Sequence, residues 1–400
     1  MDALAVSLSD VKIGILERFE DERHCFSFCK EYIDSFLKSR PVLGQIFEDR
    51  FPNSIFVDGP ICWFVHLLPQ GVMLRWRSNL LSIDEHDTFE LLAHLGDDLP
   101  GAIKLTPCES ELRSTRPVSF RKEHVTADES SFRFSLAGAQ WKLSARSAGR
   151  GLTTAASSGS TAYIAKFHSP EYPGLPQCEF ASMSWARAAG ISTPEFSLRH
   201  VSEFDEIPEG MPTGDGTAFV IERFDRSSFG RIHIEDFGQI LDRPPGQSQY
   251  HGSYEEIARV IKWIAPSSAV EFVKNLVFHV IAGNGDAHLK NFSMMYPDTR
   301  NAVLSPAYDI VSTVLYVTPG KEELALTLAG QKKFKSVSLA SFNQLFESLG
   351  WEQHFGRQVV TDFTEAAFDA WRQNDIRLNF SKLQVDRLQS HIDSLALASE

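Results

Sequence analysis

Apolar residues along the first part of the chain occur in short runs that alternate with polar residues. Val11–Leu16 and Asn53–Val57 have this pattern and are predicted to form strands. Phe89–Leu95 repeats its apolar residues at helical spacing and stops at Gly96, which is typical of the residue that follows a helix. Residues 1–110 are therefore predicted to form a small α/β unit.

A predicted β-hairpin and a low-complexity segment follow. Residues 132–136 alternate like a strand, 137–140 form a turn with one glycine, and 141–143 begin the returning strand. Residues 144–161 are rich in Ser, Gly, Ala and Thr. This composition predicts a mobile loop in preference to a packed element.

The next elements are predicted as strand, helix and strand. Ala162–Phe167 is a strand that carries Lys166, and Cys178–Ala189 is a helix that carries Glu179. Thr217–Phe224 is a largely apolar strand that leads into a polar turn. This order indicates a second small lobe that mixes strands with a helix.

From about residue 255 onward the periodicity is chiefly helical. Helices are predicted over residues 254–264, 270–281, 339–349 and 358–374. The chain as a whole is therefore predicted to be an α+β protein. Its expected parts are an N-terminal α/β subdomain over residues 1–110, a small lobe over 111–228 and a mostly helical lobe over 229–400.

Composition narrows the possible classes of function. The chain has 400 residues, 43% of them hydrophobic, which is enough for two or three globular lobes. Its formal charge of −13 disfavours a free-standing nucleic-acid binder. There is no long apolar run and no signal-peptide pattern at the N-terminus, so a cytoplasmic location without a membrane partner is expected. The five cysteines form no CxxC pair and are expected to be reduced packing residues: Cys25, Cys29, Cys62, Cys108 and Cys178.

The strongest chemical signal is a set of two carboxylates and one amide. Asp286 and Asn291 have the spacing Asp-x₄-Asn, and Asp309 follows eighteen positions later (309 − 291). Phosphoryl transfer requires one carboxylate near the attacking hydroxyl, together with an amide and a second carboxylate that hold Mg²⁺ against nucleotide phosphates. A loop rich in Asp and Asn can also serve turn formation alone. The position of all three residues beside apolar runs favours the catalytic interpretation.

Lys166 is the candidate ligand for the nucleotide phosphates. A single lysine at the end of an apolar strand usually extends into solvent. However, Glu179 lies thirteen positions later (179 − 166) near the start of a predicted helix. This arrangement suits an ion pair that directs the ammonium group toward the α- and β-phosphates.

Two further segments are weaker candidates by themselves. The turn at 136–140 lacks a Walker pattern, yet its backbone N–H groups are suited to cover phosphate oxygens near Lys166. The charged run that begins at Glu222 is ordinarily a solvated strand end. In a kinase it is the hinge, where the carbonyl of Glu222 and the N–H of Phe224 face adenine. His279 and His288, nine positions apart (288 − 279), lack the spacing of a metal site on one helix face.

These segments together resemble the HipA-type serine/threonine kinases, the toxin halves of bacterial toxin–antitoxin pairs. The resemblance covers nearly the full length. Its parts are the Gly-containing ATP loop at 134–140, the lysine strand at 164–166, the hinge at 221–226, the catalytic loop at 284–293, the metal loop at 307–309 and the N-terminal subdomain segments at 67–71, 89–96 and 101–105.

The resemblance implies a two-lobed protein-kinase-like fold that uses ATP and Mg²⁺. It assigns Asp286 as the catalytic base, Asn291 and Asp309 as metal ligands, and Ser135 as the site of autophosphorylation. Residues implied to contact the nucleotide are Ala137, Gly138, Ala139, Gln140, Lys142, Lys166, Glu222, Phe224, His288, Lys290 and Tyr308. The chain departs from the family pattern at Trp141 and at Ile310-Val311, which replace a small or acidic residue and Phe-Gly respectively.

The resemblance also implies a biological setting. Relatives phosphorylate an aminoacyl-tRNA synthetase and are held in check by a helix-turn-helix antitoxin of the HipB type, through which they reach operator DNA. A small-molecule phosphotransferase of the aminoglycoside or choline kinase type has a similar Asp-x-His-x-x-Asn loop and stays an alternative. A non-catalytic co-repressor that binds the antitoxin is a second alternative.

Overall fold

The computed structural model describes residues 2–37, 40–109, 140–148, 151–154, 162–205 and 207–398. The chain forms two compact units. The first contains residues 1–138, 225–248 and 295–301, and the second contains residues 139–224, 249–294 and 302–400. This packing division differs in its boundaries from the three sequence-based parts, which remain a prediction.

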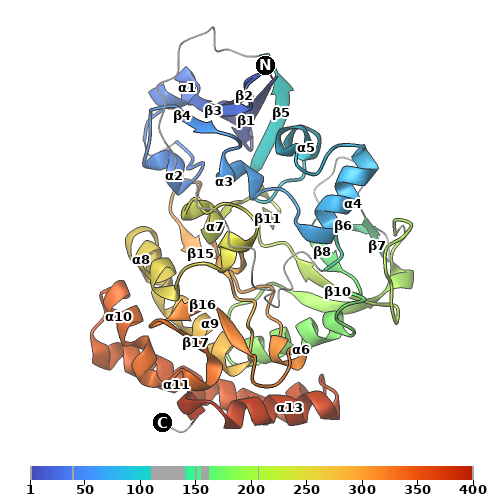
Figure 1. Cartoon of the computed structure of the whole chain (residues 1–400), viewed down its shortest axis with the longest axis vertical. Coiled ribbons are helices and arrows are strands. Elements are labelled where there is room, and N and C mark those ends of the chain that lie inside the picture. Colours follow the sequence, from blue (N-terminus) through green and yellow to red (C-terminus); the bar gives the residue numbers. More distant parts are fainter. Residues whose placement is uncertain are drawn as a thin grey trace. The chain divides into compact units, whose positions relative to one another are not determined.

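The first unit is built on an antiparallel sheet with the strand order β4-β3-β2-β1-β5 (Figure 1). Its strands are β1 (Asp2–Leu8), β2 (Val11–Arg18), β3 (Arg23–Phe28), β4 (Ile55–Asp58) and β5 (Ile103–Cys108). In β1 the alternating residues Leu4, Val6 and Leu8 are buried. This period of two fits a sheet that buries one face. The strands predicted within residues 11–16 and 53–57 are confirmed as parts of β2 and β4.

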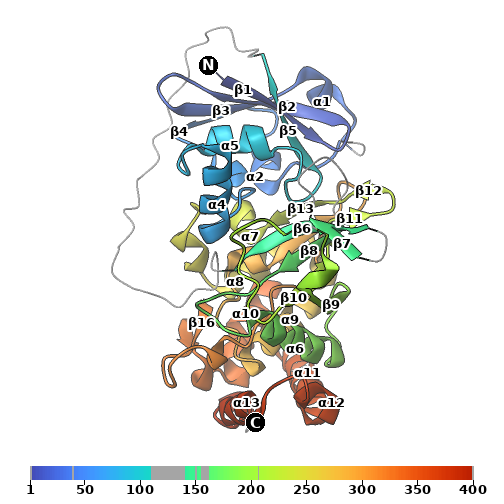
Figure 2. The same ribbon diagram turned by 90° about the vertical axis from the view of Figure 1, so that its right-hand side faces the viewer.

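Helices cover this sheet and enclose an aromatic core. They are α1 (Lys30–Asp34), α2 (Gln45–Glu48), α3 (Cys62–Val65), α4 (Gly71–Leu81) and α5 (Thr88–Leu95). Figure 2 shows α5 lying along one face of the sheet. The Asp87 side chain accepts a hydrogen bond from the Glu90 backbone N–H, which caps the first turn of α5. The helix ends at Leu95 and Gly96 is its C-cap, so the predicted helix is confirmed together with its last residue.

A later segment of the chain completes the first unit. It contains β11 (Arg226–Ser227), β12 (Gly230–Arg231), β13 (His233–Asp236) and α7 (Phe237–Ile240). Glu235 of β13 is fully buried. Its carboxylate accepts hydrogen bonds from Trp63 Nε1 at 2.7 Å, Tyr296 Oη at 3.0 Å and the Gln45 backbone N–H at 3.1 Å. Burial raises the pKa of this carboxyl to about 8, against the three donors that favour its charged form.

Stability of the first unit should therefore fall as the pH rises. Because the folded pKa of Glu235 exceeds its unfolded value, the folded state binds more protons between about pH 4.5 and 8. The resulting stabilisation is complete below about pH 4.5 and is lost as the pH rises through 8. Over this range the free energy of unfolding should fall by up to about 1.4 kcal/mol per pH unit. The Glu235→Gln variant should flatten the dependence of the melting temperature on pH, whereas the exposed Glu20→Gln control should not. Equal slopes in all three proteins would contradict the prediction.

The second unit contains an antiparallel sheet with the order β7-β6-β8-β10-β9. Its strands are β6 (Lys142–Ala148), β7 (Gly151–Thr154), β8 (Tyr163–Lys166), β9 (Phe196–His200) and β10 (Thr217–Glu222). The strands predicted at 162–167 and 217–224 are confirmed. The loop predicted over 144–161 is wrong for its described part, because residues 145–148 pair with 151–154. Leu143 and Ala145 are buried, so strand alternation decides the structure here and composition does not.

Helices form most of the remainder of the second unit. They are α6 (Leu175–Ala188), α8 (Tyr254–Ile264), α9 (Ala269–Ile281), α10 (Asn343–Leu349), α11 (Gln353–Arg372), α12 (Asn374–Arg377) and α13 (Lys382–Asp393). The unit also contains the short strands β15 (Val303–Leu304), β16 (Glu323–Leu328) and β17 (Gln331–Lys333). Strand β14 (Ser293–Tyr296) begins in this unit, and its last two residues belong to the first unit. Helix α11 packs on α9 and α6 (Figure 1). The Trp185 indole of α6 donates to the Ala367 carbonyl of α11 at 2.9 Å.

The predicted helices and the α+β class are confirmed, with small differences at the helix ends. Helix α8 has the predicted bounds, while α11 begins five residues earlier (358 − 353) than predicted and ends at Arg372. The predicted helix at 339–349 begins with the 3₁₀ turn Leu339–Phe342 and continues as α10. The five cysteines are free thiols, and three of them are buried. Within the described residues, no helix has the length and apolar character needed to cross a membrane.

Candidate active site

The predicted site residues that the structure describes all lie in the second unit. They come from β6, β8, the end of β10, and the loops that follow α9 and β15. Ser135, Ala137, Gly138 and Ala139 lie outside the described residues. Their expected roles in the ATP loop remain predictions.

Lys166 is the centre of a buried ionic cluster. Its side chain is 4% exposed, and its ammonium group forms ion pairs with both Glu179 of α6 and Asp309. The Gln140 side-chain amide also donates to Glu179, at 3.3 Å. Lys166 therefore does not extend into solvent, and the predicted Lys166–Glu179 pair is present. The structure adds Asp309, from 143 residues further along the chain, as a second partner.

The charges of Lys166 and Asp309 stabilise each other, whereas burial and the neighbouring charge of Asp309 raise the pKa of Glu179. Burial opposes the positive charge of Lys166, yet the carboxylates of Asp309 and Glu179 hold its pKa above the ordinary value. Burial also opposes the negative charge of Asp309, but Lys166, with Lys142 and His288 nearby, keeps its pKa below the ordinary value. Both groups are therefore charged near neutral pH. Such a cluster is suited to bind phosphate oxygens and a divalent cation.

The loop that carries Asp286 is held in place by a buried asparagine. Asn284 accepts a hydrogen bond from the Asp286 backbone N–H at 3.0 Å, and its own amide donates to His279 Nδ1 at 3.1 Å. Burial lowers the pKa of His279 to about 3, so the imidazole is neutral and can accept. The Asn291 side-chain amide donates to the Asp286 carbonyl at 2.7 Å. These bonds fix Asp286 and Asn291 within one tight turn.

Two aromatic side chains border Asp286. The Tyr250 hydroxyl donates to Asp286 Oδ1 at 2.6 Å. The Tyr250 ring meets the His288 ring edge-on, with 4.7 Å between the centroids. His288 is buried, and its Nδ1 accepts a hydrogen bond from the Lys290 backbone N–H at 3.2 Å. His288 therefore shapes the loop and lies close enough to Asp309 to affect its charge.

The loop that carries Asp309 is tied to the Asp286 loop and to α6. Asp309 has a φ of 54°, a left-handed conformation that few non-glycine residues adopt. The Thr313 hydroxyl accepts from the Gly285 backbone N–H at 2.7 Å and donates to the Gly283 carbonyl at 3.1 Å. Ser312 Oγ lies 3.0 Å from Ser182 Oγ of α6, the helix that carries Glu179. Packing therefore holds Asp309 in a strained position, as is common at functional sites.

The remaining predicted residues lie on β6, at or just after the end of β10, and beside Asp309. The rings of Phe224 and Tyr308 lie 5.2 Å apart, and the Tyr308 hydroxyl donates to the Lys290 carbonyl at 2.8 Å. Glu222 ends β10, where its backbone N–H donates to the Glu195 carbonyl at 2.8 Å. Lys142 begins β6 opposite Lys166. The second unit thus brings together most of the described residues predicted from separate parts of the sequence, while Glu222 pairs with the neighbouring strand β8.

The donor atoms fit Mg²⁺. This ion prefers oxygen ligands and is typically bound by one or two carboxylates together with substrate phosphates and water. Asp309 supplies a carboxylate, and Asn291 supplies an amide oxygen because its amide nitrogen is already bound to the Asp286 carbonyl. Among the described residues, no three His, Cys, Asp or Glu side chains converge to form a metal site by themselves. One carboxylate and one amide oxygen would leave the other ligand positions of Mg²⁺ to phosphates and water.

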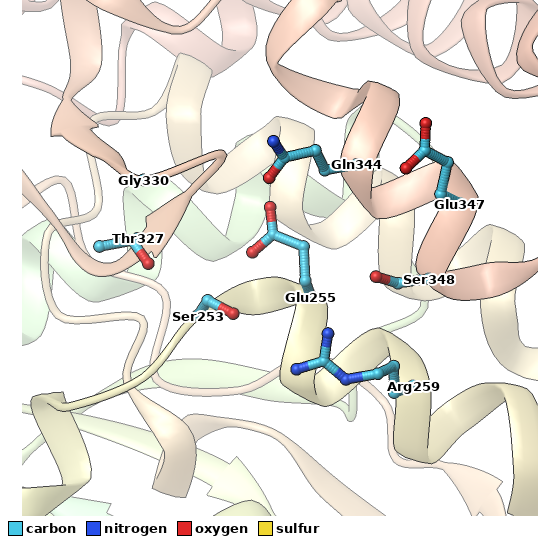
Figure 3. Close-up of a pocket in the computed structure, with 8 residues that line it drawn as sticks. All are labelled: Ser253, Glu255, Arg259, Thr327, Gly330, Gln344, Glu347 and Ser348. Carbon is cyan, nitrogen blue, oxygen red and sulfur yellow. The ribbon is translucent and has the colours of Figure 1, made fainter.

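The second unit also has a pocket of about 520 Å³ outside this cluster (Figure 3). It is lined by Ser253, Glu255, Arg259, Thr327, Gly330, Gln344, Glu347 and Ser348. None of these is a predicted site residue. The Glu255 carboxylate accepts from the Ala329 backbone N–H at 2.7 Å, which fixes the chain between β16 and β17.

Sequence reasoning did not assign roles to Asn284 or Tyr250. Asn284 begins the predicted catalytic loop, and its place just before a glycine and an aspartate was the available signal. Tyr250 gave no comparable signal, since it ends a polar segment 36 residues before Asp286. Only the folded structure brings its hydroxyl to the carboxylate.

Comparison with known proteins identifies the family. The model of the HipA-like C-terminal domain matches residues 134–371, and that of the HipA N-terminal domain matches residues 4–106. The chain belongs to the HipA family. The resemblance seen in the sequence is thereby confirmed, and this is the family of HipA-type kinases. Both matches together span most of this HipA-family chain.

Individual relatives agree with this assignment. One relative is Y4dM of Sinorhizobium fredii, a protein named as a kinase by inference. It is 34% identical over 413 residues, which cover 99% of this chain and 98% of the relative. The serine/threonine-protein kinase toxin HipA of Shewanella oneidensis is 24% identical and covers 76% of this chain and 74% of its own. A solved structure of HipA with HipB and operator DNA from Shewanella oneidensis matches 98% of this chain and 96% of its own, with a TM-score of 0.73 and 20% identity. That structural similarity supports the HipA fold.

Proposed function

We propose that this HipA-family chain is an ATP-dependent protein kinase that transfers the γ-phosphate to a serine or threonine hydroxyl. The observation that carries the proposal is the buried ammonium of Lys166, paired with both Glu179 and Asp309. In protein kinases a strand lysine paired with a helix glutamate anchors the phosphates, while an aspartate holds the metal. The same three residue types occur here on β8, on α6 and after β15.

The proposed mechanism gives each side chain one task. Asp286 receives the proton of the attacking hydroxyl, which makes the oxygen a better nucleophile. Lys166 binds phosphate oxygens and orients the nucleotide. Asn291 and Asp309 would hold Mg²⁺, which when bound neutralises charge on the phosphate oxygens. Phe224 and Glu222 would contact the adenine at the hinge.

The other predicted nucleotide contacts keep their place in the proposal. Gln140, through its bond to Glu179, and Lys142, opposite Lys166, would face the phosphates. The nucleotide would also be bordered by His288 and Lys290 from the Asp286 loop and by Tyr308 from the Asp309 loop. The hydrogen bond from Tyr308 to the Lys290 carbonyl joins these two loops.

The proposed biological role is that of a toxin in a toxin–antitoxin module. The substrate would be a translation protein, with an aminoacyl-tRNA synthetase as the candidate. A helix-turn-helix antitoxin of the HipB type would bind the chain and link it to operator DNA. The similarity to a solved structure of HipA in complex with HipB and operator DNA supports this choice of partners. The formal charge of −13 agrees with DNA binding through the partner alone.

Ser135 is the proposed site of autophosphorylation. A phosphate there would add a charge of about −2 next to the nucleotide phosphates and repel them. After incubation with ATP and Mg²⁺, the peptide that contains Ser135 should gain the mass of one phosphate. The Asp286→Asn variant should show no such gain. An unmodified peptide from active wild-type protein would contradict this site.

Phosphoproteomics after brief expression tests the proposed function. Wild type should increase phosphorylation at a serine or threonine of a translation protein, and the Asp286→Asn variant should not. Growth arrest should follow the same pattern. Equal phosphoproteomes for wild type and variant, with both proteins folded, would contradict a protein kinase. Transfer to a small alcohol in place of protein would support the phosphotransferase alternative.

A further inference from the structure

Two buried tyrosines, four positions apart, bind the same loop in different ways. The Tyr250 hydroxyl donates to Asp286 Oδ1 at 2.6 Å. The Tyr254 hydroxyl donates to the backbone carbonyl of Ala287 at 3.1 Å. The relative exposures of Tyr250 and Tyr254 are 3% and 0%. Tyr250 thus contacts the functional carboxylate, whereas the Tyr254 hydroxyl contacts the main chain beside it.

A short hydrogen bond to a carboxylate has a directional effect. Bonds between a hydroxyl and a charged oxygen are shorter and stronger than neutral ones. The bond from Tyr250 fixes Asp286 Oδ1 and thereby the rotation of the carboxyl plane. In the proposed mechanism Oδ2 would then be the oxygen that receives the proton of the attacking hydroxyl. Because a general base must lie within hydrogen-bond reach of that proton, fixing the plane raises the fraction of productive encounters.

Tyr250 is itself held firmly. Its ring packs edge-on against His288, with an interplanar angle of 89°. Its carbonyl accepts from Lys332 Nζ at 3.4 Å, and the same ammonium donates to the Ala325 carbonyl at 2.5 Å. The main chain and the ring are both fixed, so the hydroxyl has a defined position. This support is what a positioning group requires.

We propose that Tyr250 is a positioning residue that acts through Asp286 and sets which carboxylate oxygen receives the substrate proton. The inference rests on the proposed kinase function and adds a residue from the segment before α8 to it. Tyr250 touches neither the nucleotide nor the acceptor in this scheme. Its removal should therefore lower the rate of phosphate transfer and leave nucleotide binding almost unchanged.

Tyr250→Phe and Tyr254→Phe form a matched pair, because each removes one buried hydroxyl bonded to the same loop. The assay measures transfer from γ-labelled ATP with Mg²⁺ to casein and to the chain itself. Tyr250→Phe should lower kcat about ten- to a hundredfold, the range for a hydrogen bond to a charged group, with the KM for ATP within about threefold of wild type. Tyr254→Phe should keep kcat within about threefold of wild type. It should lower the melting temperature at least as much as Tyr250→Phe does.

Combining Tyr250→Phe with Asp286→Asn tests the route of action. If Tyr250 acts through Asp286, the second change should have almost no effect once the carboxylate is absent. A loss of the same factor in both backgrounds would overturn the inference, as would equal losses of kcat for the two tyrosine variants. A wild type whose transfer does not depend on Asp286 would instead contradict the proposed function.

A second variant covers the case in which Tyr250→Phe does not fold. Difluorotyrosine at position 250 keeps the ring and the hydroxyl but makes the hydroxyl a stronger donor, which withdraws charge from the carboxylate. It should lower kcat about twofold or more without changing the melting temperature. The same substitution at position 254 should leave kcat unchanged. No difference between the two positions would overturn the inference.

Discussion

The Asp286→Asn variant should lose phosphate transfer by a factor of about 10²–10⁴ while it still binds ATP. Asparagine has nearly the same shape as aspartate and keeps an oxygen that can accept from the Tyr250 hydroxyl, which lies 2.6 Å from Asp286 Oδ1. The bond from the backbone N–H of residue 286 to Asn284 is also retained. The variant thus lacks the basic oxygen and little else. Single-turnover transfer and equilibrium binding of ATP measure the two effects separately.

Asp369→Asn is the matched control for this change. Asp369 lies on α11, its side chain is 71% exposed, and it pairs with Arg372 at the surface. Its substitution should leave both the rate and the affinity unchanged. A similar loss of ATP affinity and of rate in the Asp286 variant would indicate misfolding, and full activity would exclude Asp286 as the base.

Lys166→Met should impair both stability and turnover. It leaves the carboxylates of Glu179 and Asp309 together without their shared cation, and Glu179 is fully buried. Removal of one partner of a buried ion pair commonly costs about 3–5 kcal/mol. Because Asp309 is 32% exposed and keeps Lys142 nearby, we expect a loss of about 3 kcal/mol in the free energy of unfolding. ATP affinity should fall about ten- to a hundredfold because a charged phosphate contact is lost.

A double variant separates these two effects. Adding Glu179→Gln to Lys166→Met removes one of the two carboxylates that have lost their shared cation. The double variant should recover part of the lost free energy of unfolding, measured with urea. ATP affinity should not recover, since the ammonium is still absent. Lys335→Met, at an exposed position, is the control and should change neither quantity. An unaltered free energy of unfolding in Lys166→Met would contradict the buried cluster.

Some parts of the site and its sheet were predicted correctly from the sequence, and others were not. The Lys166–Glu179 pair was predicted because a strand and the following helix bring two residues thirteen positions apart into reach. The turn that holds Asp286 and Asn291 was predicted because it is local. The strands at 145–148 and 151–154 were missed because small polar residues suggested a loop, whereas pairing with a neighbouring strand stabilises them.

Contacts between distant segments were not available from the sequence pattern. The direct pairing of Lys166 with Asp309 depends on two loops and α6 packing together through Thr313 and Ser182. Tyr250 reaches Asp286 only because the segment before α8 packs on the loop after α9. Buried hydrogen bonds such as these follow from packing, and no local periodicity reports them.

The order of strands and helices, the α+β class and membership in the HipA family were determined by the sequence itself. Local spacing of apolar residues sets helices and strands, and the short polar motifs lie at fixed distances from them. The tertiary structure alone decided that one ammonium group joins two carboxylates and that a tyrosine hydroxyl binds Asp286. These arrangements form because burying charged and polar groups is unfavourable unless partners from distant segments satisfy them.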